Sequence, residues 1–317
     1  MLLRRSALAF AAMLVSTIHC AAAQAAELVQ VTESVWRVRG DRPGAAVASV
    51  VVSPSGLMVI DSTCRSEGDA AWLKGELQRR FNQPVRYVVL SHDHEDHICN
   101  LDVFDDTAIT IAHERTREHI VRENRNTSIP SITFDTRATV WLGDKEIQIL
   151  HFGPSHSDNL VQVYVPSERV LIAPDFMQRG QGLFPDFRDM DIDGMLRTWN
   201  YVYRMLDIDV IINGHGEPSP REEILNNIRY VSALRERVLQ EMVNGKSLPE
   251  MMDTIQLPEF ANWRGYDRLL RGNIATMWYY LYGRREPNLG PAHDAWQNVE
   301  AVILQGAAEA NNVRPRD

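Results

Sequence analysis

The chain has no surplus of positive charge. It carries 33 lysines and arginines against 42 aspartates and glutamates among 317 residues, a formal net charge of −9. A protein that binds a polyanion needs a cationic surface, and this composition does not supply one. We therefore expect no nucleic-acid partner and a small molecule as the substrate.

Long hydrophobic runs and internal repeats are also missing. The most apolar stretch, residues 7–18, is too short to cross a bilayer; it follows Arg4 and Arg5 and leads to Ala-Gln-Ala at residues 23–25. This order is typical of a secretory signal peptide. We expect residues 1–25 to be a cleaved signal, the protein to be periplasmic or secreted, and no stable membrane anchor. An amphipathic N-terminal helix is the alternative.

Cysteine is scarce, with three residues in the chain. Cys20 falls within the expected signal, which leaves Cys64 and Cys99. In an oxidising compartment these two can form a single disulfide, although a chain of this size does not need one for stability. Both lie beside segments that we place at the active-site edge, so a bridge and a pair of small buried thiols both stay open.

The hydrophobic pattern predicts an α/β chain. Hydrophobic residues make up 44% of it, enough for one large domain or two small ones. A strand, a helix and a strand in succession, at 57–60, 72–81 and 87–90, imply a parallel crossover. Further strands are expected at 35–39, 48–52, 139–142, 146–150, 160–165, 170–173 and 209–212.

From residue 192 onward the pattern is mainly helical. The last expected helix ends at Gly283. Ser219 with Glu222, and Ser247 with Glu250, both have the spacing of a capping box at the start of a helix. Helices are expected at 192–206, 224–242 and 270–281.

The densest cluster of metal-binding residue types is Ser-His-Asp-His-Glu-Asp-His at residues 91–97, directly after an apolar predicted strand. His92 and His94 are two apart, so in an extended segment they project to the same side and can share one metal ion. Asp96 and His97 cannot both point that way, which suits a second ion beside the first. A polar turn with chance histidines is the competing interpretation, disfavoured by three histidines and three acids within six residues.

This segment resembles the HxHxDH signature of the metallo-β-lactamase superfamily. Later stretches resemble the family's further motifs in the family's order. These are Gly153-Pro154-Ser155-His156-Ser157 for its Gly-x-x-His-Thr/Ser turn, Leu171-Ile172-Ala173-Pro174-Asp175 for the strand ending in a bridging aspartate, and Asn213-Gly214-His215-Gly216 for its Pro-Gly-His-Gly turn. Val59-Ile60-Asp61-Ser62 is similar to its Val-Ile-Asp-Thr loop, so the resemblance covers roughly residues 28–217.

The resemblance implies a four-layer αββα sandwich with the site on loops at one sheet edge. It also implies two Zn²⁺ ions per subunit, with iron or manganese as alternatives, because imidazole and carboxylate ligands suit all three metals. Cys99-Asn100, Pro174 and Asn213 depart from the family pattern without removing a ligand. By this matching the first metal takes His92, His94 and His156, the second takes Asp96, His97 and His215, and Asp175 bridges them.

The expected organisation is a signal at 1–25, the metallo-β-lactamase-fold domain at 26–217, C-terminal helices packed on the same domain at 218–285, and a loosely attached polar tail at 286–317. Residues 176–191 form a long loop without pattern, and such loops are usually mobile or functional. Phe176 and Phe184 in this loop are expected to bind an apolar substrate, with Met177, Leu183 and Phe187 beside them. A small core within the loop is the alternative.

The implied function is that of an exported hydrolase in which a hydroxide bridging the two metal ions attacks the substrate. Asp96 is the expected catalytic residue, because it can orient the hydroxide while it binds the second ion. Asp61 is either a partner of a ligating histidine or a turn-forming carboxylate. An aspartate at 175 resembles the ligand set of glyoxalase-II-like thioesterases and lactonases, which true β-lactamases generally lack. An ester, thioester or lactone is therefore the first expected substrate.

Three alternatives stay open. One is β-lactam hydrolysis. Another is sulfate ester hydrolysis, since residues 257–258 and 271–283 look loosely similar to a segment of bacterial alkylsulfatases, although those enzymes use glutamates as metal ligands. The third is a metal-binding or redox protein without hydrolytic activity, which the full ligand set and the lack of a flavin-type glycine fingerprint disfavour.

Four further histidines lie outside these motifs. His113 and His119 are expected at the surface of a polar helix. His151 is expected at a strand end, where it either packs or supports a metal ligand. His293 falls in the expected tail and is given no role.

Overall fold

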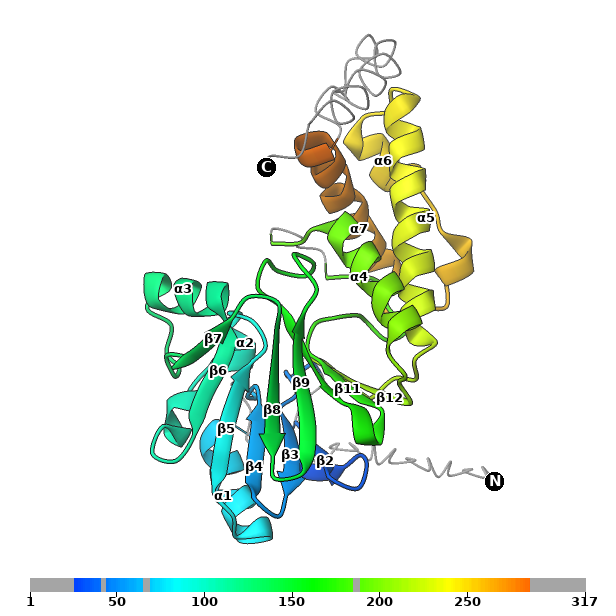
Figure 1. The fold of residues 1–317 in the computed structure, drawn as a ribbon. Helices are drawn as coiled ribbons and strands as arrows, with labels where there is room; N and C mark the ends of the chain where they lie inside the picture. The colour runs from blue at the N-terminus through cyan, green and yellow to red at the C-terminus, as the bar shows by residue number, and fades with distance from the viewer. Residues whose placement is uncertain (1–25, 41–43, 65–68, 185–188, 286–317) are drawn as a thin grey trace, which may run out of the picture.

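The computed structural model describes residues 26–40, 44–64, 69–184 and 189–285. Figure 1 shows two β-sheets packed face to face with helices on both outer sides. The strand orders are β1-β2-β3-β4-β5-β6-β7 in one sheet and β12-β11-β10-β9-β8 in the other. The predicted αββα sandwich is confirmed, while the expected signal at 1–25 and tail at 286–317 lie outside the described residues.

The seven-stranded sheet is mixed. An antiparallel meander comprises β1 (Glu27–Gln30), β2 (Val35–Arg39), β3 (Ser49–Ser53) and β4 (Gly56–Ile60). Parallel to β4 follow β5 (Val85–Leu90), β6 (Ile109–His113) and β7 (Ile132–Phe134). The predicted crossover from β4 to β5 is made by α1 (Ala70–Phe81), which Asp69 caps by accepting a hydrogen bond from the backbone N–H of Trp72.

The five-stranded sheet is mixed as well. Its antiparallel part comprises β8 (Arg137–Leu142), β9 (Lys145–His151), β10 (Val161–Val165) and β11 (Val170–Ala173). The chain then passes through α4 (Ile192–Met205) to β12 (Val210–Asn213), which is parallel to β11. The shorter elements are α2 (Glu95–Ile98), α3 (Glu114–Glu123), η1 (Leu101–Phe104), η2 (Pro166–Glu168) and η3 (Pro258–Phe260).

Three buried hydrophobic clusters account for the layering. The first lies between the sheets, where Ile60 and Val89 of one sheet join Ile149 and Val163 of the other. The second lies between the seven-stranded sheet and α1 and includes Leu73. The third covers the outer face of the five-stranded sheet. Because burial of apolar area is the main force that holds layers together, each interface stabilises the edge on which the loops sit.

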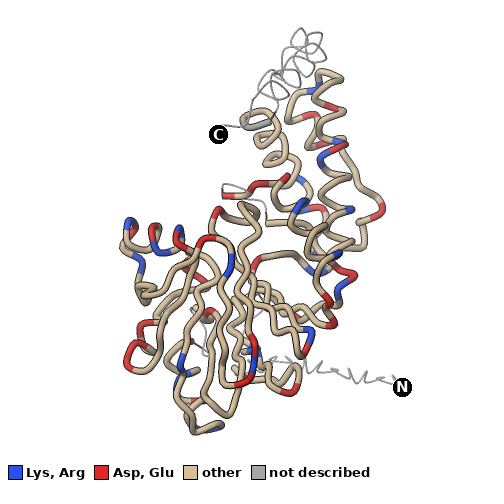
Figure 2. Tube along the Cα trace, in the orientation of Figure 1, with Lys and Arg blue, Asp and Glu red and all other residues tan. Residues whose placement is uncertain are grey.

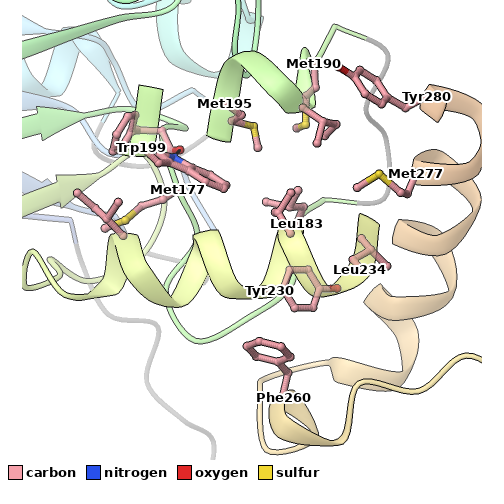
Figure 3. Packing of buried hydrophobic residues seen from close by; sticks show 14 of the residues in the cluster. Met177, Leu183, Met190, Met195, Trp199, Tyr230, Leu234, Phe260, Met277 and Tyr280 are labelled. Atoms are coloured by element: carbon pink, nitrogen blue, oxygen red, sulfur yellow. Dashed lines mark hydrogen bonds between the residues drawn. The ribbon is translucent and has the colours of Figure 1, made fainter. Parts of the chain in front are cut away.

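The third cluster contains α4, α5 (Glu223–Val243), α6 (Leu248–Thr254) and α7 (Tyr266–Tyr280). Figure 3 shows Trp199 of α4, Tyr230 of α5 and Met277 of α7 around Leu183, which comes from the loop after β11. The C-terminal helices therefore hold part of this loop in place. A domain boundary at residue 217 stays a prediction.

Two helix ends differ from expectation. The capping box predicted at Ser219 is wrong: α5 begins at Glu223, while Ser219 forms two backbone hydrogen bonds of 2.8 Å with Ile211 of β12. The capping box of Ser247 and Glu250 is confirmed. The last helix does not end at Gly283, because α7 continues as a π-helical segment, η4 (Leu281–Arg285). Among the described residues, no helix combines the length and the hydropathy needed to span a membrane.

Candidate metal centre

The loops that carry the predicted ligands follow β5, β9, β11 and β12. In the β5 loop the backbone bends at His92 and Asp93, His94 has extended dihedral angles, and α2 then begins at Glu95. This change of direction turns Asp96 and His97 away from His92 and His94, as their spacing predicted. The other loops bring His156, Asp175 and His215 to the same place.

The first cluster consists of His92, His94, His156 and Asp175, whose ligand atoms all lie within 4.8 Å of one another. His156 Nε2 is 3.1 Å from His94 Nδ1 and 3.3 Å from Asp175 Oδ2. The Nε2 atom of His92 is buried and has no hydrogen-bond partner. Four ligand atoms thus face one point from three loops.

The second cluster consists of Asp96, His97 and His215. His97 Nε2 is 3.3 Å from His215 Nε2 and 3.7 Å from Asp96 Oδ2. Asp175 Oδ1 lies 3.3 Å from His97 Nε2 and 3.2 Å from His215 Nε2. One oxygen of Asp175 therefore faces each cluster, which is the geometry of a bridging carboxylate.

The donor set fits metal ions. A tetrahedral zinc with bonds of about 2.0–2.1 Å places its ligand atoms about 3.3 Å apart, close to the spacings above. His92 Nε2 and Asp175 Oδ1 are buried without a hydrogen bond, and buried polar atoms normally have a partner. A cation in each cluster would satisfy both.

Burial and neighbouring charges shift the pKa values of the cluster histidines in opposite directions. Burial, the largest cause, lowers the pKa of His156 to about 4 and that of His92 well below its usual range, so both rings are neutral and ready to bind metal. Burial also acts to lower the pKa of His97, but Asp175 and Asp61 outweigh it and raise that pKa well above its usual range. His97 would therefore have to lose a proton from Nε2 before this atom could hold a cation.

Asp61 supports both clusters from behind. Its side chain is fully buried; Oδ2 lies 3.1 Å from His97 Nδ1 and accepts a 2.6 Å hydrogen bond from Ser91 Oγ. Ser91 Oγ is in turn 2.8 Å from His92 Nδ1. Of the two roles considered for Asp61, the structure shows the contact with a predicted ligand. Such partners fix the orientation and tautomer of a ligating imidazole.

Asn159 joins the two loops of the first cluster. Its amide donates to Asp93 Oδ1 (2.7 Å) and Asp158 Oδ1 (2.9 Å), and its Oδ1 accepts from the backbone N–H of Asp93 and from Thr116 Oγ1, both at 3.1 Å. The side chain is buried. The loop that carries His94 is thereby tied to the turn that carries His156.

Two supporting contacts were missed in the sequence. Asp189 Oδ2 lies 2.9 Å from His94 Nε2, and His215 Nδ1 lies 3.0 Å from the backbone oxygen of Gly44. Both come from segments without a hydrophobic pattern, and the second is a backbone contact. Nothing in the residue types alone could have identified them.

The two cysteines left open in the sequence form a disulfide. Cys64 follows β4, Cys99 is the C-cap of α2, and their Cα atoms are 5.8 Å apart. The bridge therefore lies directly beside the segment that carries Asp96 and His97.

A cavity of about 940 Å³ opens over both clusters. Phe184 is on its wall, 43% exposed, with its ring centroid 5.8 Å from that of His215. Phe176 is 2% exposed, packs against Trp199 and is not on the wall, so its predicted substrate contact is not retained. Phe187 lies outside the described residues. Met177 and Leu183 belong to the third hydrophobic cluster.

The other histidines differ in their surroundings. The prediction for His113 is wrong: it ends β6, is 1% exposed and lies with its ring centroid 4.0 Å from that of His151. Within the described part of the chain, His151 makes no hydrogen bond with a predicted metal ligand. Its Nδ1 lies 3.0 Å from the backbone oxygen of Leu160. His293 is outside the described residues.

His119 lines the cavity rather than the open surface, with its Nε2 atom 3.0 Å from Asp158 Oδ1. It lies on α3, where Figure 2 shows acidic and basic residues close together. Arg122 and Glu123 of this helix also line the cavity. α3 thus contributes polar side chains to the cavity wall, and Phe184 contributes an aromatic ring beside His215.

Comparison with known sequences gives one family and several relatives. The sequence model of the metallo-beta-lactamase superfamily matches residues 41–215. The chain is 30% identical over 170 residues to the 2,4-dinitroanisole O-demethylase subunit alpha of Nocardioides sp. (strain JS1661), covering 51% of this chain but only 49% of that protein. It is 22% identical over 201 residues to a metallo-beta-lactamase type 2 of Elizabethkingia meningoseptica, covering 61% and 78%.

Solved structures share the fold. A metallo-beta-lactamase from Pontibacter korlensis superposes with a TM-score of 0.60 at 18% identity, over 65% of this chain and 99% of the other. A stereoselective inverting sec-alkylsulfatase from Pseudomonas sp. superposes with a TM-score of 0.68 at 20% identity, over 89% of this chain and 57% of the other. The second match extends beyond the residues that the family model covers, so it includes part of the C-terminal helices.

Proposed function

Because the chain belongs to the metallo-β-lactamase superfamily and is a metal-dependent hydrolase, we propose that it cleaves a carboxylic ester, thioester or lactone at a pair of zinc ions. In this proposal His92, His94 and His156 hold the first ion, Asp96, His97 and His215 hold the second, and Asp175 bridges them. Iron or manganese can replace zinc with these ligands. We further propose that residues 1–25 direct the protein to the periplasm or outside the cell.

The placement of Asp175 is the observation that supports this substrate class. Its two oxygens face different clusters, at 3.2–3.3 Å from His97, His156 and His215. A bridging carboxylate in addition to three ligands per ion resembles thioesterases and lactonases of the family more than its β-lactamases. β-Lactam hydrolysis therefore ranks second.

Two of the chain's own residues prepare the reaction beside the metal ions. When bound, two divalent cations supply hydroxide at neutral pH and polarise the bond under attack. Asp96 is the ligand most open to the cavity, with 56% of its side chain exposed, whereas His97 is fully buried. Asp96 is thus placed to orient the nucleophile while its Oδ2 faces the second cluster. Phe184 offers an apolar surface to the substrate beside His215.

Cleavage of a sulfate ester or an aryl ether is a third candidate. The fold shared with the sec-alkylsulfatase covers 89% of this chain, and the most identical of the relatives above is named as an O-demethylase. Both names describe cleavage of a bond to oxygen in a substrate other than a carboxylic ester. Neither likeness identifies the substrate of this chain.

A parallel assay tests the ranking. Purified, metal-analysed protein is incubated with a thioester, a lactone, a chromogenic cephalosporin, an alkyl sulfate and an aryl methyl ether, each also with a His94→Ala variant. We expect turnover of the thioester or lactone that the variant loses. Turnover of the cephalosporin alone, or of the sulfate or ether alone, contradicts the proposed substrate class.

A further inference from the structure

We propose that the Cys64–Cys99 disulfide is a positioning element for the second metal ion: it fixes α2, which carries Asp96 and His97, to the loop after β4. The inference rests on the metal assignment proposed above. Cys99 stands where the family resemblance leads us to expect glycine.

The loop at residues 61–64 runs alongside α2 and contacts the backbone of Asp96 and His97. The backbone N–H of Ser62 donates to the oxygen of His97 (2.6 Å), and that of Cys64 donates to the oxygen of Asp96 (3.4 Å). The backbone N–H of Cys99 donates to the oxygen of Glu95 (3.2 Å). The disulfide closes this arrangement covalently at the end of α2.

α2 needs such an anchor because it cannot hold its own shape. It has four residues, and its N-cap residue, His94, makes no side-chain capping hydrogen bond. A helix of one turn is unstable in water, because nucleation costs more than one turn of hydrogen bonds returns. The directions of Asp96 and His97 therefore depend on contacts from outside the helix.

Those outside contacts are unequal for the two ligands. His97 is fully buried and is also held by Asp61, whereas the side chain of Asp96 is 56% exposed. Among the described contacts, Asp96 has no hydrogen-bonding partner apart from its neighbours in the second cluster. Its backbone is fixed by Cys64 through the long 3.4 Å hydrogen bond and by the disulfide.

The first cluster has a different support. Asn159 ties the loop of His94 to the turn of His156, and Ser91 contacts His92. Neither support passes through α2. Loss of the disulfide should therefore lower the affinity for the second metal ion and leave the affinity for the first unchanged.

Chemical reduction of the Cys64–Cys99 disulfide removes the bridge reversibly. A small dithiol reductant transfers two electrons to the disulfide, the sulfur–sulfur bond breaks, two protons are taken up to give two thiols, and the reductant becomes a cyclic disulfide. The released α2 can then move away from its position in the closed form. Reoxidation should restore it.

The test compares Cys64→Ala, Cys99→Ala and the double variant with wild type, by metal content and by the Co²⁺ affinity of each site followed in the absorption spectrum. We expect the affinity of the second ion to fall about 10- to 100-fold, the range typical for supporting contacts, with the first ion retained. Each single variant should equal the double variant, because one lost cysteine already removes the bridge. Asn159→Ala is the matched control and should lower the affinity for the first ion instead.

Three results would overturn the proposal. The first is a double variant that binds the second ion as tightly as wild type, and the second is wild-type protein with two free thiols. Additive losses in the single variants would also contradict it, since they indicate local packing. If the double variant does not fold, wild type before and after dithiol treatment supplies the comparison. Wild type that binds no metal would instead refute the proposed function.

Discussion

At the scale of single residues, the centre depends on buried carboxylates that contact histidines rather than solvent. Asp61 has a positive φ of 60° and Asp175 one of 47°, a region that side chains other than glycine rarely adopt. Such strain persists only where surrounding contacts enforce it. For Asp61 those contacts are the hydrogen bonds from Ser91 and His97.

Asp61→Asn tests this carboxylate directly. The amide keeps the shape but removes the charge that favours an N–H on His97 Nδ1 and a lone pair on Nε2. We expect the affinity for the second metal ion to fall about 10- to 100-fold, measured by competition with a chelator. Asp106→Asn, an exposed acid paired with Lys74, should bind metal as wild type does. Equal affinities for the two variants would contradict the role given to Asp61.

Gly214 is required because of its closeness to Asp175. A Cβ atom at Gly214 would overlap the backbone nitrogen and Oδ1 of Asp175 and lie 2.9 Å from the Cα of Pro174. We expect Gly214→Ala to displace Asp175 and reduce kcat/KM about 100-fold, as small shifts of catalytic groups do.

Gly75 in α1 is the matched control, since a Cβ atom there meets nothing within 4 Å. Gly75→Ala should leave activity unchanged and stabilise the protein by about 1 kcal/mol through its higher helix propensity. Full activity in Gly214→Ala would show that the contact with Asp175 does not matter.

At the scale of elements, the long regular segments could be predicted and the short ones could not. Apolar residues lie on one face of α1, α4 and α5, and apolar runs or alternation mark β4, β5 and β9 to β11. Because the buried faces of these elements require apolar residues, their periodicity is visible in the sequence. α2 has four residues and β7 three, too few for any periodicity. The sequence pattern did not predict β6, which lies between β5 and the edge strand β7, nor the burial of His113 at its end.

The candidate site divides in the same way. The seven side chains proposed as metal ligands were predicted because their residue types and order resemble those of a family. Their supports in Asp189, Gly44 and Asn159 depend on loops meeting in space, which the sequence does not encode locally. The departure of Ser219 from its expected cap has the same cause, since pairing with β12 outweighs a local capping preference.

Asn159→Ala tests the junction between elements. The change removes the side-chain partner of the backbone N–H of Asp93 and of Asp93 Oδ1 in a buried place. Unsatisfied buried groups cost about 1–3 kcal/mol each, so we expect unfolding free energy to fall by at least about 2 kcal/mol in denaturant titration. A loss below about 0.5 kcal/mol would indicate that the two loops hold their positions independently.

At the scale of the whole molecule, Glu168 connects the two sheets. It accepts hydrogen bonds from the backbone N–H of Ser34 (3.0 Å), from the side chains of Thr32 and Ser34 and from Lys145 (2.7 Å). Thr32 and Ser34 precede β2, whereas Lys145 begins β9. Although burial acts to raise the pKa of Glu168, these hydrogen bonds lower it to about 2.

The lowered pKa gives a sign for the pH dependence of stability. A carboxyl group with a folded-state pKa near 2, below its ordinary value of 4.5, stabilises the fold above pH 4.5, and that contribution is lost as the pH falls toward 2. We expect Glu168→Gln to be less stable than wild type at pH 7 and the difference to shrink below pH 4.5. A difference that stays constant from pH 7 to pH 3 in urea unfolding would contradict this.

The central claim is that seven side chains from four loops hold two metal ions in one molecule. The most direct measurement is the metal content of the purified protein, determined together with that of His92→Ala and His215→Ala variants by elemental mass spectrometry. The account predicts two ions per chain in wild type and about one in each variant. A wild-type protein without bound metal, or variants that keep both ions, would contradict it.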